Sequence, residues 1–469
     1  MGRMNAGFRI PLDERACDVL RTIEATGESA WFVGGCVRDA LLGRPAHDFD
    51  IATSARWPNV AALARERGWR VVDTGCAHGS IAVVADGLPV ETTTYRVESG
   101  YSDARRPDSV KFVDDIASDL ARRDFRMNAI AYHPERGLLD PFDGRGDIAR
   151  RIVRTVGDAR KRFEEDPLRI MRALRFSAQL GFAIDPATER FVFACAPHLE
   201  RVAKERLFAE LSKLLLSPCA GRTLARYAAV IERIVFSATH RAHAPGESGD
   251  KSPFEKTARI VDAAPVGKTV RFAALFCDFD EGEGSPGERE SQAAKRRADD
   301  ARSCLERLKA PRALTQDAAA LVAAAADPCR ARREDMLLQA ARYDGDVAFL
   351  RMLFALEDAC EKAASGKSRG KEALFDELLA RGEPMSRRDL ALSGRDLVEC
   401  GIAPGPAIAL VLDSMLAAVI AGRIANSRDE LIAAVPRFLA SVDDAAASGA
   451  AEKYRKKMRQ DVDEDGKAR

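Results

Sequence analysis

Two aspartates, Asp48 and Asp50, are separated by one residue in the segment DFDIAT at 48–53. The alternation of this segment predicts a β-strand, on which side chains at i and i+2 leave the same face. Two carboxylates about 7 Å apart can share two divalent ions, and Mg²⁺ prefers one or two carboxylates together with phosphate oxygens and water. The pair therefore suits a nucleoside triphosphate, with one ion activating a hydroxyl and the other holding pyrophosphate. By itself it is a weak signal, because many such pairs lie on solvated strand ends.

A glycine turn and an arginine lie just upstream of the two aspartates. The segment AWFVGG at 30–35 predicts a strand that ends in the turn Gly34-Gly35, and VRDALLG at 37–43 predicts a short helix that contains Arg38. Two consecutive glycines let a backbone approach a phosphate, and the helix N-terminus presents free N–H groups. Two glycines alone more often mark a simple turn, but this combination favours a triphosphate site.

Glu91 is a candidate for a third carboxylate. The segments at 79–84 and 88–95 flank the tripeptide ADG, which predicts a β-hairpin with Glu91 on its second arm. If that hairpin lies beside the strand at 48–53, Glu91 joins the two aspartates. From spacing alone, an exposed strand glutamate is an equally good interpretation.

The pattern along the chain predicts an α+β protein, with a head of strands and helices followed by an all-helical remainder. Strand and helix signals mix over residues 1–150, and the strand signals fade from about residue 160. Helices are predicted at 167–181 and 205–217, and the chain then reads as helical to about residue 445. Three polar stretches are expected to be solvated loops, at 239–256, 279–300 and 363–372.

Composition excludes several classes of protein. Among 469 residues, 73 lysines and arginines face 72 acids, so a globally basic nucleic-acid coat is excluded. The ten cysteines contain no C-x-x-C pair, which argues against a zinc ribbon and fits a reducing cytosol. No signal-peptide core and no apolar stretch of about 18 residues is present, so we expect no membrane association and a cytoplasmic protein.

Four motifs in order resemble the class II tRNA nucleotidyltransferases (CCA-adding enzymes) and their bacterial poly(A) polymerase relatives. The resemblance spans roughly residues 30–220, and its motifs are FVGGCVRDALLGRPAHDFDIAT, DLARRDFRMNAIAY at 119–132, LLDPFDGRGDI at 138–148 and EDPLRIMRALRF at 165–176. It implies a polymerase-β-like nucleotidyltransferase head followed by neck, body and tail helices that hold the tRNA acceptor end. The implied division is a catalytic head (1–150), a base-recognition neck (151–222), a body (223–330) and a tRNA-binding tail (331–450). The charge of the last residues separately predicts a disordered end (451–469).

The resemblance also implies roles for individual residues. Asp48 and Asp50 match the metal-binding, catalytic carboxylates, and Glu91 matches the third acid. The implied cofactor is Mg²⁺. The residues that match nucleotide contacts are Gly35, Arg38, Arg123, Asn128, Arg172 and Arg175, with Asn128 ordering the sugar site. Asp124 is a less secure candidate, since it could form a salt bridge with an arginine of its own motif.

Asp166 and Arg169, three residues apart at the start of a predicted helix, could choose the base. Cytosine and adenine both offer an amino donor beside a ring-nitrogen acceptor, which a carboxylate and a guanidinium match. Guanine and uracil reverse that order, so CTP and ATP would be accepted without a nucleic-acid template. Followed by Pro167, Asp166 is also a good helix N-cap, and spacing alone favours the cap. The resemblance favours base recognition, and one carboxylate can do both.

The predicted activity is addition of C, C and A to the tRNA 3′ end with CTP and ATP, and the oligomeric state is left open. A poly(A) polymerase is the first alternative, although RVVDTGCAHGSIAVV after the first motif resembles the CCA-adding version. An enzyme that adds only CC or only A is the second, although the loop-bearing span at 96–112 is intact. An inactive RNA-binding protein is the third, and the intact carboxylates argue against it. Cys277-Asp278 stands where some relatives have a His-Asp metal pair, so we expect no phosphohydrolase activity.

Overall fold

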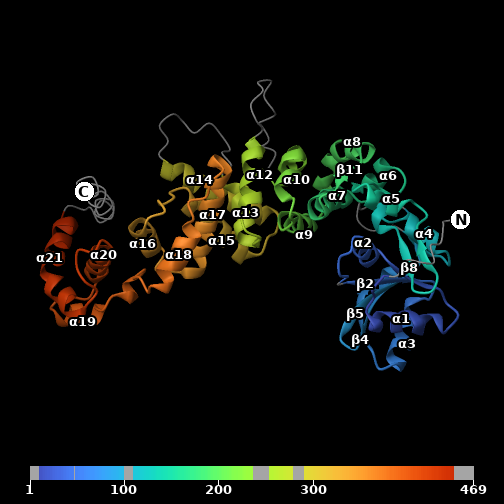
Figure 1. Cartoon of the computed structure of the whole chain (residues 1–469), viewed down its shortest axis with the longest axis horizontal. Coiled ribbons are helices and arrows are strands. Elements are labelled where there is room, and N and C mark those ends of the chain that lie inside the picture. The colour runs from blue at the N-terminus through green and yellow to red at the C-terminus, as the bar shows by residue number, and fades with distance from the viewer. Residues whose placement is uncertain (1–9, 47, 100–108, 236–252, 278–289, 448–469) are drawn as a thin grey trace, which may run out of the picture. The chain divides into compact units, whose positions relative to one another are not determined.

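The computed structural model divides the chain into two compact units. The first unit comprises residues 1–258 and 303–312, and the second comprises residues 259–302 and 313–469 (Figure 1). The residues that the structure describes are 10–46, 48–99, 109–235, 253–277 and 290–447. The predicted five-part division of the chain stays a prediction.

The first unit begins with a seven-stranded mixed sheet in the order β3-β4-β5-β2-β1-β8-β9. Strands β2 and β5 are parallel, and the other neighbours are antiparallel. The strands are β1 (Ala30–Val33), β2 (Phe49–Thr53), β3 (Arg70–Gly75), β4 (Ser80–Ala85), β5 (Leu88–Thr94), β8 (Ala131–His133) and β9 (Gly137–Leu139). The helices of this region are α1 (Glu14–Glu24), α2 (Gly35–Leu41), α3 (Trp57–Glu66), α4 (Ile116–Ala121), the short turn η2 (Arg126–Asn128) and α5 (Gly144–Ala149). This architecture and the helical remainder confirm the predicted α+β class.

The predicted hairpin at β4 and β5 is confirmed, and its turn explains why the sequence signal was clear. Asp86 and Gly87 have φ of 47° and 83°, the positive values that a two-residue hairpin turn requires. β5 then pairs in parallel with β2. A second hairpin, β6 (Arg96–Ser99) with β7 (Ser109–Phe112), was not predicted. It flanks residues 100–108, so the predicted loop within 96–112 lies largely outside the described residues.

Asp50 lies on a buried face of the sheet. Ala52, two residues along β2, packs in an apolar cluster with Trp31, Val33 and Leu120. Because strand side chains alternate between faces, Asp50 leaves the sheet on the same side as Ala52. Helices α1 and α3 also contact strands of the sheet and each other. The sheet therefore presents Asp50 toward the segments that follow it in the chain, α4 and η2.

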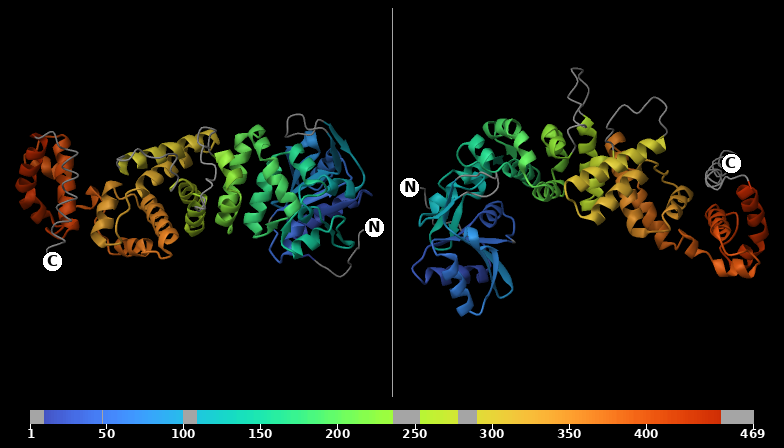
Figure 2. Two further views of the ribbon diagram at one scale, coloured as in Figure 1. Left: turned by 90° about the horizontal axis from the view of Figure 1, so that it is seen from above. Right: turned by 180° about the vertical axis from the view of Figure 1, so that it is seen from behind.

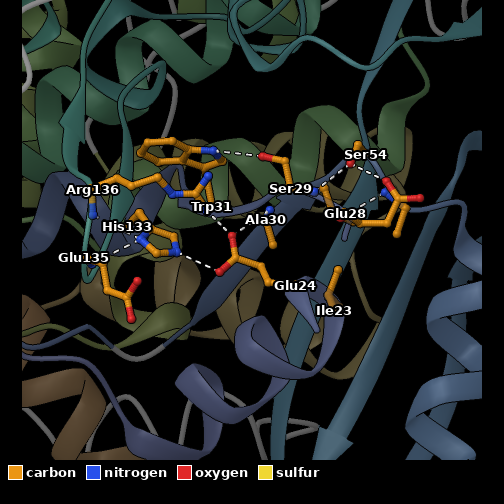
Figure 3. A network of polar contacts seen from close by, with 12 residues as sticks. Ile23, Glu24, Glu28, Ser29, Ala30, Trp31, Ser54, His133, Glu135 and Arg136 are labelled. Carbon is orange, nitrogen blue, oxygen red and sulfur yellow. Dashed lines mark hydrogen bonds and ion pairs between the residues drawn. The ribbon is translucent and has the colours of Figure 1, made fainter. Parts of the chain in front are cut away.

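A polar network ties the end of α1 to the start of β1 and to β8 (Figure 3). His133 Nδ1 accepts the N–H groups of Glu135 and Arg136, so Nε2 carries the ring proton and donates it to Glu24 at 2.9 Å. Arg136 also pairs with Glu24 and lies 4.7 Å from the ring centroid of Trp31. These contacts hold β1, the strand that ends at the glycine turn.

The rest of the first unit is mainly helical. Its elements are α6 (Ala159–Glu165), α7 (Leu168–Leu180), α8 (Pro186–Ala194), η3 (Ala196–Arg201), α9 (Lys204–Leu215), α10 (Ala220–Arg226), α11 (Ala228–Val235) and the small parallel pair β10 (Ile152–Val153) with β11 (Ala183–Ile184). Helices α7 and α9, both predicted, lie side by side (Figure 2). The pair of two-residue strands is an addition to the predicted all-helical neck.

From residue 253 onward the described chain is helical. Its helices are α12 (Pro253–Ala263), α13 (Lys268–Phe276), α14 (Glu290–Arg307), α15 (Arg312–Ala325), α16 (Arg333–Arg342), α17 (Val347–Ser365), α18 (Lys371–Ala380), α19 (Gly394–Glu399), α20 (Pro406–Ile420) and α21 (Arg428–Ala447), with a short turn η5 (Arg387–Asp389). Apolar side chains of α16 to α21, among them Met336, Phe375 and Met415, form one buried core. None of the described helices is long and apolar enough to cross a membrane.

The prediction of solvated polar loops is only partly correct for two of the three stretches, although residues 366–369 do form an exposed loop as expected. α14 begins at Glu290, inside the stretch 279–300. In the stretch 363–372, α17 continues to Ser365, and Lys371 at the start of α18 is fully buried. Its ammonium lies 2.7 Å from Glu357 and 3.0 Å from Glu361, so a charged residue that looked solvated is held in an internal ion-pair cluster. Most of the third stretch, 239–256, lies outside the described residues.

Candidate active site

Three carboxylates come together where β2 and β5 run in parallel. Asp48 immediately precedes β2 and is exposed, whereas Asp50 lies within the strand and is half-buried. Asp50 is the register partner of Glu91 on β5. Neighbouring strands are about 4.8 Å apart, so Glu91 lies directly beside Asp50. The condition on which the third carboxylate depended, a hairpin beside the aspartate strand, is therefore met.

The electrostatic surroundings of Asp50 favour the binding of a cation by its carboxylate. Burial raises the pKa of Asp50 to about 6, with Arg123 and Arg38 opposing this effect and the charges of Glu91 and Asp48 adding to it. Among the described residues no three metal-ligating side chains already form a cage. Mg²⁺ usually takes only one or two carboxylates and completes its octahedron with phosphate oxygens and water. A partly desolvated carboxylate next to two others is therefore a donor set that fits Mg²⁺ arriving with a triphosphate.

The glycine turn brings the backbone against this cluster. Gly34 has φ of 78°, a conformation that L-residues rarely adopt. A methyl group added to Gly34 would lie 3.2 Å from Asp50 Oδ2 and 3.2 Å from Arg123 Nη1. Gly35, the predicted contact, lies beside Arg38 instead, since a methyl group added there would be 3.7 Å from Nη2 of that arginine. The structure therefore adds Gly34 to the candidate residues, a position that the double glycine already indicated.

Arg38 is buried and already well bonded. Its Nε and Nη2 each lie 2.9 Å from a carboxylate oxygen of Asp39, and its Nη1 donates to Asn128 Oδ1 at 2.8 Å. Asn128 Nδ2 in turn donates to Asp124 Oδ1 at 3.2 Å. Two predicted nucleotide contacts, Arg38 and Asn128, are thus joined directly. Asp39, which orients Arg38, was missed because an acid next to an arginine is common on helix surfaces.

The alternative interpretation of Asp124, a salt bridge within its own motif, is wrong in its partner. Asp124 pairs with Arg172 of α7, whose Nη2 and Nε lie 2.6 Å and 2.8 Å from Oδ2. Burial alone would raise the pKa of Asp124, but the charge of Arg172 and hydrogen bonds from Arg172, Asn128 and the Phe125 N–H outweigh it, giving about 2. The pair links the head to the neck helix.

The pH dependence of stability should report this link. Because the folded pKa of Asp124 lies below its ordinary value of 3.8, the pair stabilises the fold above pH 4 and loses this effect as the pH falls toward 2. The contribution is about 2 kcal/mol at neutral pH, with about half lost at pH 3. Asp124→Asn should therefore flatten the fall in thermal unfolding temperature between pH 5 and pH 3. Exposed Asp114→Asn is the control, and parallel curves for Asp124→Asn and the wild type would contradict the assignment.

Arg172 and Arg175 of α7 lie, together with Arg38, around the aromatic ring of Phe176. Arg175 Nε donates to Glu210 Oε2 of α9 at 2.6 Å, and Arg172 Nη1 lies 4.0 Å from the same carboxylate. The guanidinium carbons of Arg38, Arg172 and Arg175 lie 5.2, 5.5 and 3.9 Å from the ring centroid of Phe176. These arginines are therefore an ordered group rather than the solvated basic stripe that a three-residue spacing also allows. Glu210 was missed, although a glutamate on a largely apolar helix was a usable signal.

Asp166 and Arg169 flank the start of α7 without bonding to each other through their side chains in the described contacts. Asp166 Oδ1 accepts the N–H of Leu168 at 3.0 Å, and Oδ2 accepts from Arg206 of α9 at 3.0 Å. The side chain does cap the helix, although α7 starts at Leu168, so Asp166 precedes the cap position. Arg169 Nη1 pairs with Glu165 at 2.7 Å, and Nη2 lies 3.4 Å from a carbonyl oxygen in the RRDF motif, that of Arg122. Arg206 and Glu165 were not predicted.

Three family models match the chain in sequence order. The "Poly A polymerase head domain" matches residues 30–154, the "Probable RNA and SrmB- binding site of polymerase A" matches 181–228, and the tRNA nucleotidyltransferase domain 2 matches 291–435. The first model spans all the strands of the sheet, and the second spans α8 to α10. The matches thus cover both the carboxylate cluster and much of the helical remainder.

Relatives and solved structures agree with the family models. The chain is 35% identical to the CCA-adding enzyme of Geobacillus stearothermophilus over 425 residues, 90% of this chain and 96% of that protein. It is 49% identical to the CCA-adding enzyme of Lactiplantibacillus plantarum over 212 residues, 45% of this chain and 51% of that one. The crystal structure of the Bacillus stearothermophilus CCA-adding enzyme in complex with CTP aligns with a TM-score of 0.68 at 32% identity, covering 92% of this chain and 98% of that one. The sheet carries the paired aspartates, and the sequence similarity to a CCA-adding enzyme extends over nearly the full length of both chains. The chain therefore belongs to the CCA-adding enzymes, a family of nucleotidyltransferases.

Proposed function

We propose that this chain adds C, C and A to the 3′ end of tRNA from CTP and ATP by two-metal nucleotidyl transfer. The observation that carries the proposal is the juxtaposition of Asp50 and Glu91 on parallel strands, next to Asp48 and the Gly34 turn. The relatives support the product, because the full-length match is named a CCA-adding enzyme and a solved relative is described in complex with CTP.

Asp48 and Asp50 would hold Mg²⁺, which when bound polarises phosphoryl oxygens and lowers the pKa of an attacking hydroxyl. Glu91, beside Asp50, adds negative charge that strengthens the attraction for the cation. Arg123, which lies against the Gly34 turn, would form an ion pair with the triphosphate and stabilise the negative charge that develops on the departing pyrophosphate. Arg38 lies beside Gly35 and, held by Asp39 and Asn128, would support the same phosphates from a fixed position.

Asp166 and Arg169 would recognise the base, and Arg172 and Arg175 would complete the nucleotide site. Each oxygen of Asp166 accepts one hydrogen bond from the protein, so each retains a lone pair for an amino group of cytosine or adenine. Capping the helix and reading the base are therefore compatible. Arg206 and Glu165 would fix the two side chains, so that neither can rotate to accommodate guanine or uracil.

The remaining proposals concern the partner and the division of labour. The neck over 151–222 would select the base, and the body and tail over 223–330 and 331–450 would hold the tRNA. The RNA-binding model at 181–228 supports RNA contacts mainly in the neck, and the tRNA nucleotidyltransferase domain 2 model at 291–435 supports a tRNA-related role for the body and tail. The cysteines are free, which fits action in the cytoplasm.

The decisive experiment offers the purified protein a tRNA that ends at its discriminator base, with CTP, ATP or both, in Mg²⁺. The expected products are two added residues with CTP alone and three with both nucleotides. A ladder of many adenosines would indicate a poly(A) polymerase, and arrest after CC with both nucleotides present would indicate a CC-adding enzyme. A tRNA that already ends in CCA is the matched control, because it should not be extended.

A further inference from the structure

Asp119 is a fully buried carboxylate in α4 whose partners lie directly after that helix and at the start of β6. Its Oδ1 accepts from Arg122 Nε at 2.9 Å and Nη2 at 2.8 Å, and from the backbone N–H of Arg96 at 3.3 Å. Its Oδ2 accepts from Arg123 Nη2 at 3.4 Å. A carboxylate without exposure to water is tolerated only when it is paired and hydrogen-bonded. The arginines therefore supply the partners that a buried carboxylate requires. One of them, Arg123, is also a predicted nucleotide contact.

The three nitrogen atoms of the Arg123 guanidinium have different surroundings. Nη2 faces Asp119, whereas Nη1 lies 3.2 Å from the position that a methyl group on Gly34 would take. Nε is buried and makes no hydrogen bond within the described part of the chain. A buried donor without a partner is costly, so this edge of the guanidinium is suited to an incoming anion.

Asp50 competes for the same guanidinium. Asp50 Oδ2 and Arg123 Nη1 are no more than 6.4 Å apart, because each lies 3.2 Å from the same point at Gly34. An arginine freed from Asp119 would therefore find a carboxylate within a small side-chain rotation. Pairing with Asp50 would remove the guanidinium from the turn and occupy a carboxylate that the proposed reaction needs for Mg²⁺.

We propose that Asp119 is a positioning residue, which holds Arg123 against the Gly34 turn and away from Asp50 so that it meets the nucleotide triphosphate. This inference rests on the proposed function, because it assigns Arg123 to the triphosphate. The contact between Asp119 and the N–H of Arg96 lies at the first residue of β6, so the same carboxylate also anchors the base of the β6–β7 hairpin.

Two of the contacts of Asp119, those with Arg123 and with the Arg96 N–H, predict different losses. Displacing Arg123 weakens the binding of every triphosphate, whichever base it carries. Loosening the hairpin would act instead on the span 96–112, whose intact length was the argument against an enzyme that adds only CC, so its effect would fall on A addition. A rise in the KM for both CTP and ATP therefore indicates that Asp119 positions Arg123, whereas a loss confined to A addition indicates that it only anchors the hairpin.

The test is Asp119→Asn in the full chain, which keeps the shape and removes the charge. The KM values for CTP and ATP should both rise about tenfold, as expected for one charge-assisted hydrogen bond, while the affinity for tRNA stays unchanged. In an Arg123→Ala background the same substitution should change neither KM by more than about twofold, because coupled residues are not additive. Asp115→Ala is the matched control. Asp115 caps the same helix by accepting the N–H groups of Ala117 and Ser118, so its loss weakens α4 without touching Arg123.

Three results would overturn the assignment. They are unchanged KM values in Asp119→Asn, an equal rise in Asp115→Ala, or a defect confined to A addition. If Asp119→Asn does not fold at the assay temperature, Asp119→Glu retains the charge but moves it by one methylene, and it should raise both KM values. Failure of the proposed function is recognised separately, since the wild type would then not extend tRNA with CTP and ATP at all.

Discussion

Asp50→Ala should reduce nucleotide incorporation at least about a thousandfold, since the reaction loses a carboxylate that holds Mg²⁺ and with it the stabilisation of the attacking and leaving oxygens. The partial burial of Asp50 adds to the effect, because it limits the access of water that could substitute for the carboxylate at that point of β2. The affinity for tRNA should change by less than about threefold, because RNA phosphates are held mainly by arginine and lysine. Single-turnover incorporation and filter binding measure the two quantities.

Asp48→Ala should behave in the same way, whereas Glu66→Ala serves as the control. Glu66 is an exposed carboxylate at the last residue of α3, outside the strands that carry the cluster. Turnover in Mg²⁺ within tenfold of the wild type for either aspartate variant would show that the two-metal assignment is wrong. A parallel loss of tRNA affinity would point to misfolding of the head instead, which thermal unfolding would reveal.

Asp166→Ala should relax the choice of base rather than simply slow the reaction. A carboxylate can only accept hydrogen bonds, so it favours the amino groups of cytosine and adenine and disfavours the carbonyl oxygens of guanine and uracil. Its removal should reduce discrimination against GTP and UTP by about 1–3 kcal/mol, roughly tenfold to a hundredfold. Competition assays with all four nucleotides give this ratio directly, and Asp166→Asn separates it from capping because asparagine still caps a helix but also donates.

Asp158→Ala is the matched control for the capping role of Asp166. Asp158 caps α6 by accepting the N–H of Lys161 at 2.8 Å. Its loss should cost about 1 kcal/mol of stability and leave base choice unchanged. If Asp166→Asn keeps the preference for CTP and ATP while Asp166→Ala only loses stability, Asp166 is a cap and the base is recognised elsewhere.

The sequence by itself determined the local units and the chemistry they carry. The strand before Gly34, the helix with Arg38, the aspartate strand and the hairpin that bears Glu91 all follow from short-range patterns, because glycine conformation and strand alternation are encoded within a few residues. The helices that begin near Asp166 and at 204 were predicted for the same reason. The polar stretches were only partly predicted, because composition does not distinguish a solvated loop from a charged helix, and Lys371 shows that even a charged residue can be internal.

Only the tertiary structure decided which of these groups meet. Glu91 became a neighbour of Asp50 through a parallel strand pairing, and parallel pairing joins segments that no local pattern relates. Asp124 forms an ion pair with Arg172 on α7, a later part of the chain, and Asp166 forms one with Arg206 on α9. The role of Asp119 has the same origin. A buried carboxylate must be paired, but burial is a property of the assembled fold, so its partners could be identified only after the chain had been brought together around it.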